Sequence, residues 1–175
     1  ALLLSNLDAN KSMLAAGKLS VENGAHIVTQ QFLDSFLILS GSGITFGLVV
    51  AMLFAAKSKQ YKALGKVAAF PAIFNVNEPV VFGFPIVMNP VMFLPFILVP
   101  ILAAIIVYAS IAIGFMHPFS GVTLPWSTPA IISGFMVGGW QGAFVQVLVL
   151  ATSTVVYFPF FKFQDNLAYN NELQA

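Results

Sequence analysis

The 175-residue sequence contains no cysteine and no arginine, and only 7% of its residues are charged. The absence of cysteine excludes a disulfide scaffold, a thiolate metal site and a thiol nucleophile. A soluble globular domain carries roughly 25% charged residues, so a water-soluble fold is excluded as well. The chain is 59% hydrophobic and has 18 Phe, a composition typical of a protein that lies in a lipid bilayer. With a net charge of +1, no nucleic-acid partner is expected.

The beginning of the chain is more polar than the rest. Residues 1–34 carry five charged side chains: Asp8, Lys11, Lys18, Glu22 and Asp34. We expect an extramembrane or interfacial lead-in here, because this composition cannot cross a bilayer. The sequence starts at Ala1 and shows no signal peptide, so it resembles a piece of a longer protein.

Three apolar stretches predict membrane-spanning helices, which need about 20 residues each. They lie at about 35–56, 90–114 and 131–161. The first and the last contain glycines four residues apart, namely Gly43 and Gly47, then Gly134, Gly138 and Gly142. Such spacing predicts helix faces that other helices can approach closely.

Lysines mark the side of the membrane on which the loops lie. Four of them follow the first predicted span: Lys57, Lys59, Lys62 and Lys66. Their spacing predicts a short interfacial amphipathic helix, and their number places it on the cytoplasmic side. Lys162 ends the last span on the same side, so residues 163–175 are expected to form a cytoplasmic tail.

The stretch 67–89 is apolar yet cannot form an ordinary spanning helix. Residues 67–100 contain six prolines: Pro71, Pro79, Pro85, Pro90, Pro95 and Pro100. Broken backbone at membrane depth is tolerated only where protein covers it or where it lines a wet cavity. We therefore predict a re-entrant hairpin at about 67–89 with its tip at 75–79. The predicted fold class is an all-α polytopic membrane protein with about three spanning helices, this hairpin and the interfacial helix.

Glu78 is the only charged residue between Lys66 and Lys162. A carboxylate at membrane depth costs about 3 kcal/mol or more, so it must face a cavity, find hydrogen-bond donors or stay protonated. This favours a functional role for Glu78. The structural alternative is a protonated Glu that only joins two helices.

Two amides and an indole are further candidates for ligand binding. Asn75 and Asn77 flank Glu78, and amides are suited to hydroxyl-rich ligands, although Asn75 is equally suited to a turn. Trp126 lies between two prolines in LPWSTP. Its indole can pack on the apolar side of a sugar ring or lie in an interfacial aromatic belt, and the same alternatives hold for Trp140.

The remaining motifs exclude other kinds of site. His26 and His117 each stand alone, without the partners that a metal site or a catalytic triad needs, so no metal and no cofactor is predicted. The run GSGITFG follows no strand and lacks the Lys-Ser/Thr of a phosphate-binding loop. We therefore expect no ATP-driven transport.

The run FNVNEPVVFGFPIVMNP resembles EIIC, the membrane subunit of sugar phosphotransferase systems, in the lactose/cellobiose/diacetylchitobiose family. The runs LSGSGITFGLVVAMLFAAKSKQYKALGK and VTLPWSTPAIISGFMVGGWQGAFVQ resemble the same family. The similarity extends from about His26 to Lys162. The segment from Ser40 to Gly43 departs slightly from the Gly-Gly-Ser-Gly that is usual there.

This resemblance implies an architecture. Residues 35–162 would form most of the mobile transport domain of a permease that is a homodimer in the bacterial cell membrane, with two re-entrant hairpins around the sugar. The family's second ionisable site residue, a His in a Gly-Ile-His-Gly run, would lie before Ala1, and His26 does not replace it.

The resemblance also implies a substrate and a partner. Asn77, Glu78 and Trp126 would bind a β-linked disaccharide such as cellobiose, diacetylchitobiose or lactose, and from its position beside Glu78 we expect Asn75 to bind the substrate as well. A phosphocysteine of the cytoplasmic partner EIIB would phosphorylate the 6-hydroxyl of the sugar. Glu78 would be the catalytic residue, since a carboxylate can orient or deprotonate that hydroxyl. The chain would thus be the permease part of a phosphotransferase and would be inactive alone.

Two other hypotheses fit the same residues. A proton-coupled secondary sugar transporter also uses broken helices and a buried carboxylate, and Glu78 would then be its proton site. A purely structural membrane piece would give Glu78 no functional role. The phosphorylation state of the transported sugar separates the phosphotransferase from the symporter.

Overall fold

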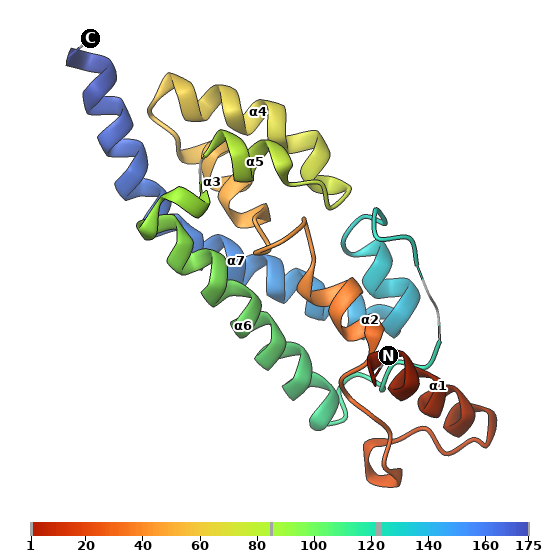
Figure 1. Cartoon of the computed structure of the whole chain (residues 1–175). Helices are drawn as coiled ribbons and strands as arrows, with labels where there is room; N and C mark the ends of the chain where they lie inside the picture. Colours follow the sequence, from red (N-terminus) through yellow and green to blue (C-terminus); the bar gives the residue numbers. More distant parts are fainter. Residues whose placement is uncertain (1, 85, 122–123, 175) are drawn as a thin grey trace.

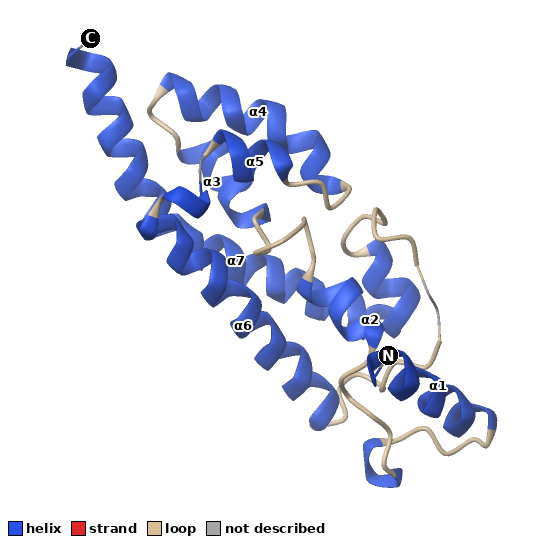
Figure 2. Ribbon diagram, viewed as in Figure 1, coloured by secondary structure: helices blue, strands red, loops and turns tan. Residues whose placement is uncertain are grey.

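The structure, a computed structural model, describes residues 2–84, 86–121 and 124–174, and every regular element in these ranges is helical (Figure 2). The predicted all-α fold class is therefore confirmed for the described residues. Pro85, one of the helix-breaking prolines, lies outside them, as do residues 122–123 of the loop before Trp126.

Among the described residues, two helices are long and apolar enough to cross a bilayer. Helix α6 (Pro90–Ala112) agrees with the span predicted at about 90–114 and continues through Pro95 and Pro100. Its 23 residues give a length of about 35 Å, which exceeds the roughly 30 Å of a hydrocarbon core. Helix α7 (Ile132–Gln174) begins where the last span was predicted but continues for 43 residues.

Helices α6 and α7 pack along each other (Figure 1). The buried stripe of α6 recurs every four residues, at Val99, Ala103, Val107 and Ile111. It belongs to one hydrophobic core with Val145 and Val149 of α7. The rest of the α6 surface is apolar and exposed, as at Ile101 and Ile105, which suits contact with lipid tails.

The prediction of one continuous spanning helix at 35–56 is wrong. Only its second half is an α-helix, α3 (Phe46–Ala55), while Leu33–Leu37 forms a π-helical turn. Between them the backbone takes positive φ at four residues: Ser40, Gly41, Gly43 and Ile44. Glycine enters this left-handed region without steric cost, so Gly43, which suggested a helix face together with Gly47, instead permits the break. Gly47 does pack closely, since a Cβ there would lie 2.3 Å from the backbone nitrogen of Thr154 on α7.

The predicted hairpin is present as two helices, α4 (Lys59–Ile73) and α5 (Glu78–Gly83). The lysine-rich interfacial helix and the first arm of the hairpin, which the sequence suggested as separate elements, are one helix, α4. A short turn, η3 (Ile86–Met88), leads from α5 into α6. Helix α4 packs on α3 and α5 (Figure 1). Re-entry of this hairpin into the membrane stays a prediction.

Helix α7 contains a break of its own, at Gly138 and Gly139, whose backbone angles are not helical. Gly134 and Gly142 meet across this break, since a Cβ on Gly142 would lie 2.3 Å from the Gly134 carbonyl oxygen. Gly134 and Gly142 thus serve packing within α7, whereas a Cβ on Gly138 would lie 3.0 Å from the Met116 Sδ in the segment after α6. The three glycines therefore do not form the predicted single face for another helix. Residues 163–174 continue α7 as helix, and their place in a cytoplasmic tail stays a prediction.

The lead-in consists of α1 (Leu2–Ala15), η1 (Val21–Asn23) and α2 (Gln30–Phe32). Asn10 is fully buried and donates hydrogen bonds to the carbonyl oxygens of His26 and Phe119, both at 2.8 Å. The lead-in is therefore fastened to the loop that precedes Trp126. Its position relative to the membrane stays a prediction.

Candidate functional site

The tip of the hairpin lies between α4 and α5, where the sequence predicted it. The amide of Val76 donates to the Pro71 carbonyl at 3.1 Å, which closes the end of α4. Asn75, just before Val76, has a φ of 62°, a conformation that Asn adopts more readily than most residues. Glu78 is then the first residue of α5, and Pro79 occupies the second position, where its missing amide costs nothing.

Asn75 joins three separate segments of the chain. Its Oδ1 accepts a hydrogen bond from the Ser40 amide at 2.6 Å. Its Nδ2 donates to the carbonyl oxygens of Trp126 at 2.7 Å and Thr128 at 3.0 Å. The hairpin tip, the break before α3 and the Trp126 turn therefore meet at one buried amide.

Asn77 and Glu78 lie on the same tip, and both keep unused hydrogen-bonding groups. Asn77 is 7% exposed and its Nδ2 donates to the Ser42 carbonyl at 2.7 Å. Gly41 makes room for it, since a Cβ there would lie 2.3 Å from the Asn77 Cγ. Within the described residues, nothing bonds to the Asn77 Oδ1 or to the exposed Glu78 carboxylate. Both oxygens are free to accept hydrogen bonds from a ligand.

The Trp126 side chain is 67% exposed on a turn that Thr128 closes. The Thr128 hydroxyl donates to the Pro125 carbonyl at 2.7 Å, and the Thr128 amide donates to the same oxygen at 3.0 Å. Trp140, the other indole, packs edge-on against Phe115 with ring centroids 5.7 Å apart. The structure thus fastens Trp126, by its backbone, to the segment that carries Asn77 and Glu78.

Helix α7 supplies the polar groups that cover the break before α3. The Ser153 hydroxyl donates to the Ile44 carbonyl and accepts from the Gly47 amide at 3.1 Å. The Tyr157 hydroxyl donates to the Gly43 carbonyl at 2.8 Å. Exposed backbone groups at membrane depth cost several kcal/mol each, so these bonds allow the break to exist. The sequence analysis missed both residues.

Gln146 satisfies backbone amides at the start of α7, before the break at Gly138 and Gly139. It is fully buried, and its Oε1 accepts from the amides of Ile131 and Gly134, the latter at 3.0 Å. Its Nε2 donates to the Ser35 carbonyl at 2.6 Å and to the Ser133 hydroxyl at 2.8 Å. The segment that follows the Trp126 turn is thereby held against the start of the first break. The sequence analysis missed this residue too.

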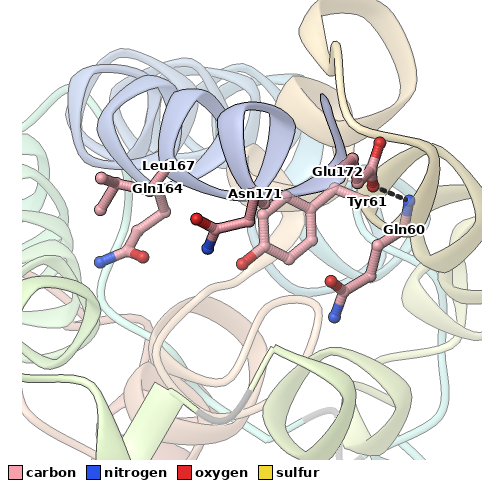
Figure 3. A pocket seen from close by; sticks show the side chains of 7 residues that line it. Gln60, Tyr61, Gln164, Leu167, Asn171 and Glu172 are labelled. Atoms are coloured by element: carbon pink, nitrogen blue, oxygen red, sulfur yellow. Dashed lines mark hydrogen bonds between the residues drawn. The ribbon is translucent and has the colours of Figure 1, made fainter. Parts of the chain in front are cut away.

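A polar groove of about 530 Å³ lies between the start of α4 and the end of α7, away from the hairpin tip (Figure 3). Its lining is rich in amides: Gln60, Tyr61, Gln164, Leu167, Ala168, Asn171 and Glu172. Glu172 accepts hydrogen bonds from the amides of Lys59 at 3.0 Å and Gln60 at 3.1 Å, and these bonds lower its pKa.

Fully buried Asp165 accepts in the same way from the two preceding amides, Lys57 at 2.7 Å and Ser58 at 3.0 Å. Two carboxylates of α7 therefore satisfy four successive amides at the start of α4.

The structure describes no metal site. Among the described residues, no group of three or more His, Asp or Glu side chains is placed to hold a metal ion. His26 uses its backbone to bond the Asn10 side chain, with its amide donating to Oδ1 at 2.8 Å.

Comparison with known proteins gives consistent matches. The family model described as "Phosphotransferase system, EIIC" matches residues 1–100. The lichenan permease IIC component of Bacillus subtilis is 44% identical over 96% of this chain and 37% of its own length. The cellobiose-specific EIIC component of Geobacillus stearothermophilus is 44% identical over 80% of this chain and 32% of its own length. The lactose-specific EIICB component of Lacticaseibacillus casei is 35% identical over 94% of this chain and 28% of its own length.

A solved structure is similar as well. The transporter ChbC, the IIC component of the N,N'-diacetylchitobiose-specific phosphotransferase system, aligns with a TM-score of 0.89 at 38% identity. The alignment covers 97% of this chain and 39% of ChbC. The chain thus spans less than two fifths of the length of each of these proteins.

Proposed function

The chain belongs to the EIIC family of sugar phosphotransferase systems, as its sequence suggested, and we propose that it forms the sugar-binding part of a permease for a β-linked disaccharide. The names of its relatives specify lichenan, cellobiose, lactose and diacetylchitobiose, all of which are β-linked saccharides. The transport activity belongs to the intact protein that contains this chain. That protein would be a multi-pass homodimer in a bacterial cell membrane, with lipid against its exposed apolar helix faces.

The observation that carries this proposal is the junction at Asn75. It brings the tip with Asn77 and Glu78 together with the Trp126 turn, although about 50 residues separate them. A flat indole and free amide and carboxylate oxygens are the groups that a sugar ring needs for its apolar face and its hydroxyls. We assign Asn77, Glu78 and Trp126 to the sugar site.

Glu78 is the residue to which we assign the chemistry. Its unpaired carboxylate is suited to accept a hydrogen bond from the sugar hydroxyl that attacks the phosphorus, and to orient or deprotonate that hydroxyl. The phosphoryl donor would be phosphorylated EIIB on the lysine-rich cytoplasmic side. Relatives named EIICB combine the two components in one name.

Vesicles that contain the intact protein test the proposal. They are supplied with phosphorylated EIIB and labelled cellobiose, lactose or diacetylchitobiose, and the internal label is analysed for phosphate. We expect sugar phosphate, and a rate at least about 100-fold lower for Glu78→Gln, which is the scale of one general base. The matched control Glu22→Gln changes an exposed carboxylate of the lead-in and should transport normally. Free sugar accumulating on a proton gradient without EIIB would refute the proposal and make Glu78 a proton site.

A further inference from the structure

We infer that Asn75 is a positioning residue, which sets sugar affinity by holding Trp126 in place and does not bind the sugar itself. The inference rests on the proposed function and deepens it. Sequence alone left Asn75 open between a ligand contact and a turn residue, and the hydrogen bonds of its side chain separate these two roles.

The first argument is that the hydrogen-bonding groups of the Asn75 side chain are already bonded to protein backbone. A primary amide has two hydrogens to donate, and Asn75 gives both to backbone carbonyls, those of Trp126 and Thr128. Its Oδ1 faces the Ser40 amide. The side chain is 9% exposed, so a sugar hydroxyl would have to displace one of these bonds to reach it. Asn77, two residues later, has one bond to Ser42 and retains a free oxygen.

The second argument is that, among the described residues, Asn75 supplies the side-chain bonds to the carbonyls of the Trp126 turn, while the Pro129 carbonyl just after it accepts from the Ser133 amide at 3.0 Å. Within residues 124–130, the hydrogen bonds that Thr128 makes to Pro125 are internal to the turn. Among the described residues, Asn75 makes the side-chain hydrogen bonds that fasten the Trp126 and Thr128 carbonyls to the hairpin. Removal of these bonds should let an indole that is 67% exposed move relative to Glu78.

Two substitutions separate the bonds of Asn75. Asn75→Gly removes all three bonds, and glycine accepts the φ of 62° without strain. Asn75→Asp keeps an acceptor for the Ser40 amide but has no amide hydrogens for the Trp126 and Thr128 carbonyls. If the Gly variant does not fold, the Asp variant still tests the connection to Trp126. Asn23→Asp, at an exposed position in the lead-in, is the control.

The test is a double-mutant cycle on sugar affinity in the intact protein, purified in detergent. The probes are labelled cellobiose, lactose and diacetylchitobiose, and the one that binds most tightly is used throughout. We expect each Asn75 variant to raise the Kd about tenfold, the scale of one well-placed contact. In a Trp126→Ala background, where no indole remains to be held, the same substitutions should change the Kd less than about twofold.

Hydrogen exchange adds a measurement without sugar. The peptide that covers residues 124–130 should exchange faster in both Asn75 variants than in the parent, while Asn23→Asp should leave its exchange unchanged. Equal exchange in all proteins would overturn the inference, because Asn75 would then not hold the turn.

The possible failures are distinguishable. A full tenfold effect of Asn75→Gly in the Trp126→Ala background would show that Asn75 contacts the sugar directly, which overturns the positioning role and leaves the proposed function standing. If the parent protein binds none of the three disaccharides, the proposed function fails, and this inference fails with it.

Discussion

Substitution of Asp165 by Asn should release the start of α4 from α7. The Asp165 carboxylate is fully buried and accepts two backbone hydrogen bonds, from the amides of Lys57 at 2.7 Å and Ser58 at 3.0 Å. An asparagine can accept only one of these bonds with its oxygen, and it turns an NH₂ group toward the other donor. A hydrogen bond to a charged group contributes about 1.5–3 kcal/mol, so we expect a loss of about 2 kcal/mol in the free energy of local opening.

Hydrogen exchange measures this loss where it occurs, since the intact membrane protein need not unfold in one step. A change of 2 kcal/mol corresponds to about 30-fold faster exchange at the Lys57 and Ser58 amides. Asp8→Asn is the matched control, because Asp8 is exposed and makes only a surface ion pair with Lys11. Exchange in Asp165→Asn that is as slow as in this control would refute the reasoning that the buried carboxylate holds α4.

Two further predictions concern other contacts of α7. Tyr157→Phe removes the donor to the Gly43 carbonyl and should cost about 1–3 kcal/mol of stability, seen as a lower melting temperature in detergent. The control Tyr108→Phe, at a half-exposed position, should change the melting temperature little. The hydrogen bonds from the Lys59 and Gln60 amides lower the pKa of Glu172 below its ordinary value of 4.5. The protection of these two amides against hydrogen exchange should therefore persist from pH 7 to about 5 and be lost as the pH falls through the lowered pKa. Glu172→Gln should abolish this pH dependence, and an unchanged dependence in that variant would contradict the assignment.

Much of the fold could be predicted from the sequence because its signals are local. Pro90 and the 23 apolar residues of α6 define a span without any tertiary information. The hairpin tip was predictable for a similar reason, since Asn75 and Pro79 restrict their own backbone. The resemblance of FNVNEPVVFGFPIVMNP to the family added Asn77 and Glu78 as a pair.

The errors arose where tertiary contacts decide the structure. The stretch 35–56 is apolar enough to predict a helix by hydropathy. Its break could not be predicted, because the hydrogen bonds that stabilise it come from Ser153 and Tyr157, about 110 residues away. The contacts of residues 163–174 with the start of α4 could not be predicted either, because the backbone amides that bond Asp165 and Glu172 lie about 110 residues earlier in the chain.

The buried polar residues of α7 follow a pattern that explains the break before α3. Gln146, Ser153, Tyr157 and Asp165 are all fully buried in this apolar helix and recur at intervals of seven, four and eight residues, which places them on one face. Ser153, Tyr157 and Asp165 bond non-helical backbone in a neighbouring segment. Gln146 bonds the amides of Ile131 and Gly134 at the start of α7 and the Ser35 carbonyl. Polar side chains at helical spacing within an apolar span therefore indicate interrupted backbone on the facing elements.

The same accounting identifies the groups that remain for a ligand. The side chains of Asn75, Gln146 and Asp165 are occupied by protein backbone, which makes them parts of the scaffold. Among the described residues of the hairpin tip, the oxygens of Asn77 and Glu78 have no such partner. Glu78 is also the only charged residue between Lys66 and Lys162, and at the membrane depth predicted from the sequence an unpaired carboxylate would be costly. The hydrogen-bonding inventory and this predicted cost both favour Glu78 as the residue proposed for the chemistry.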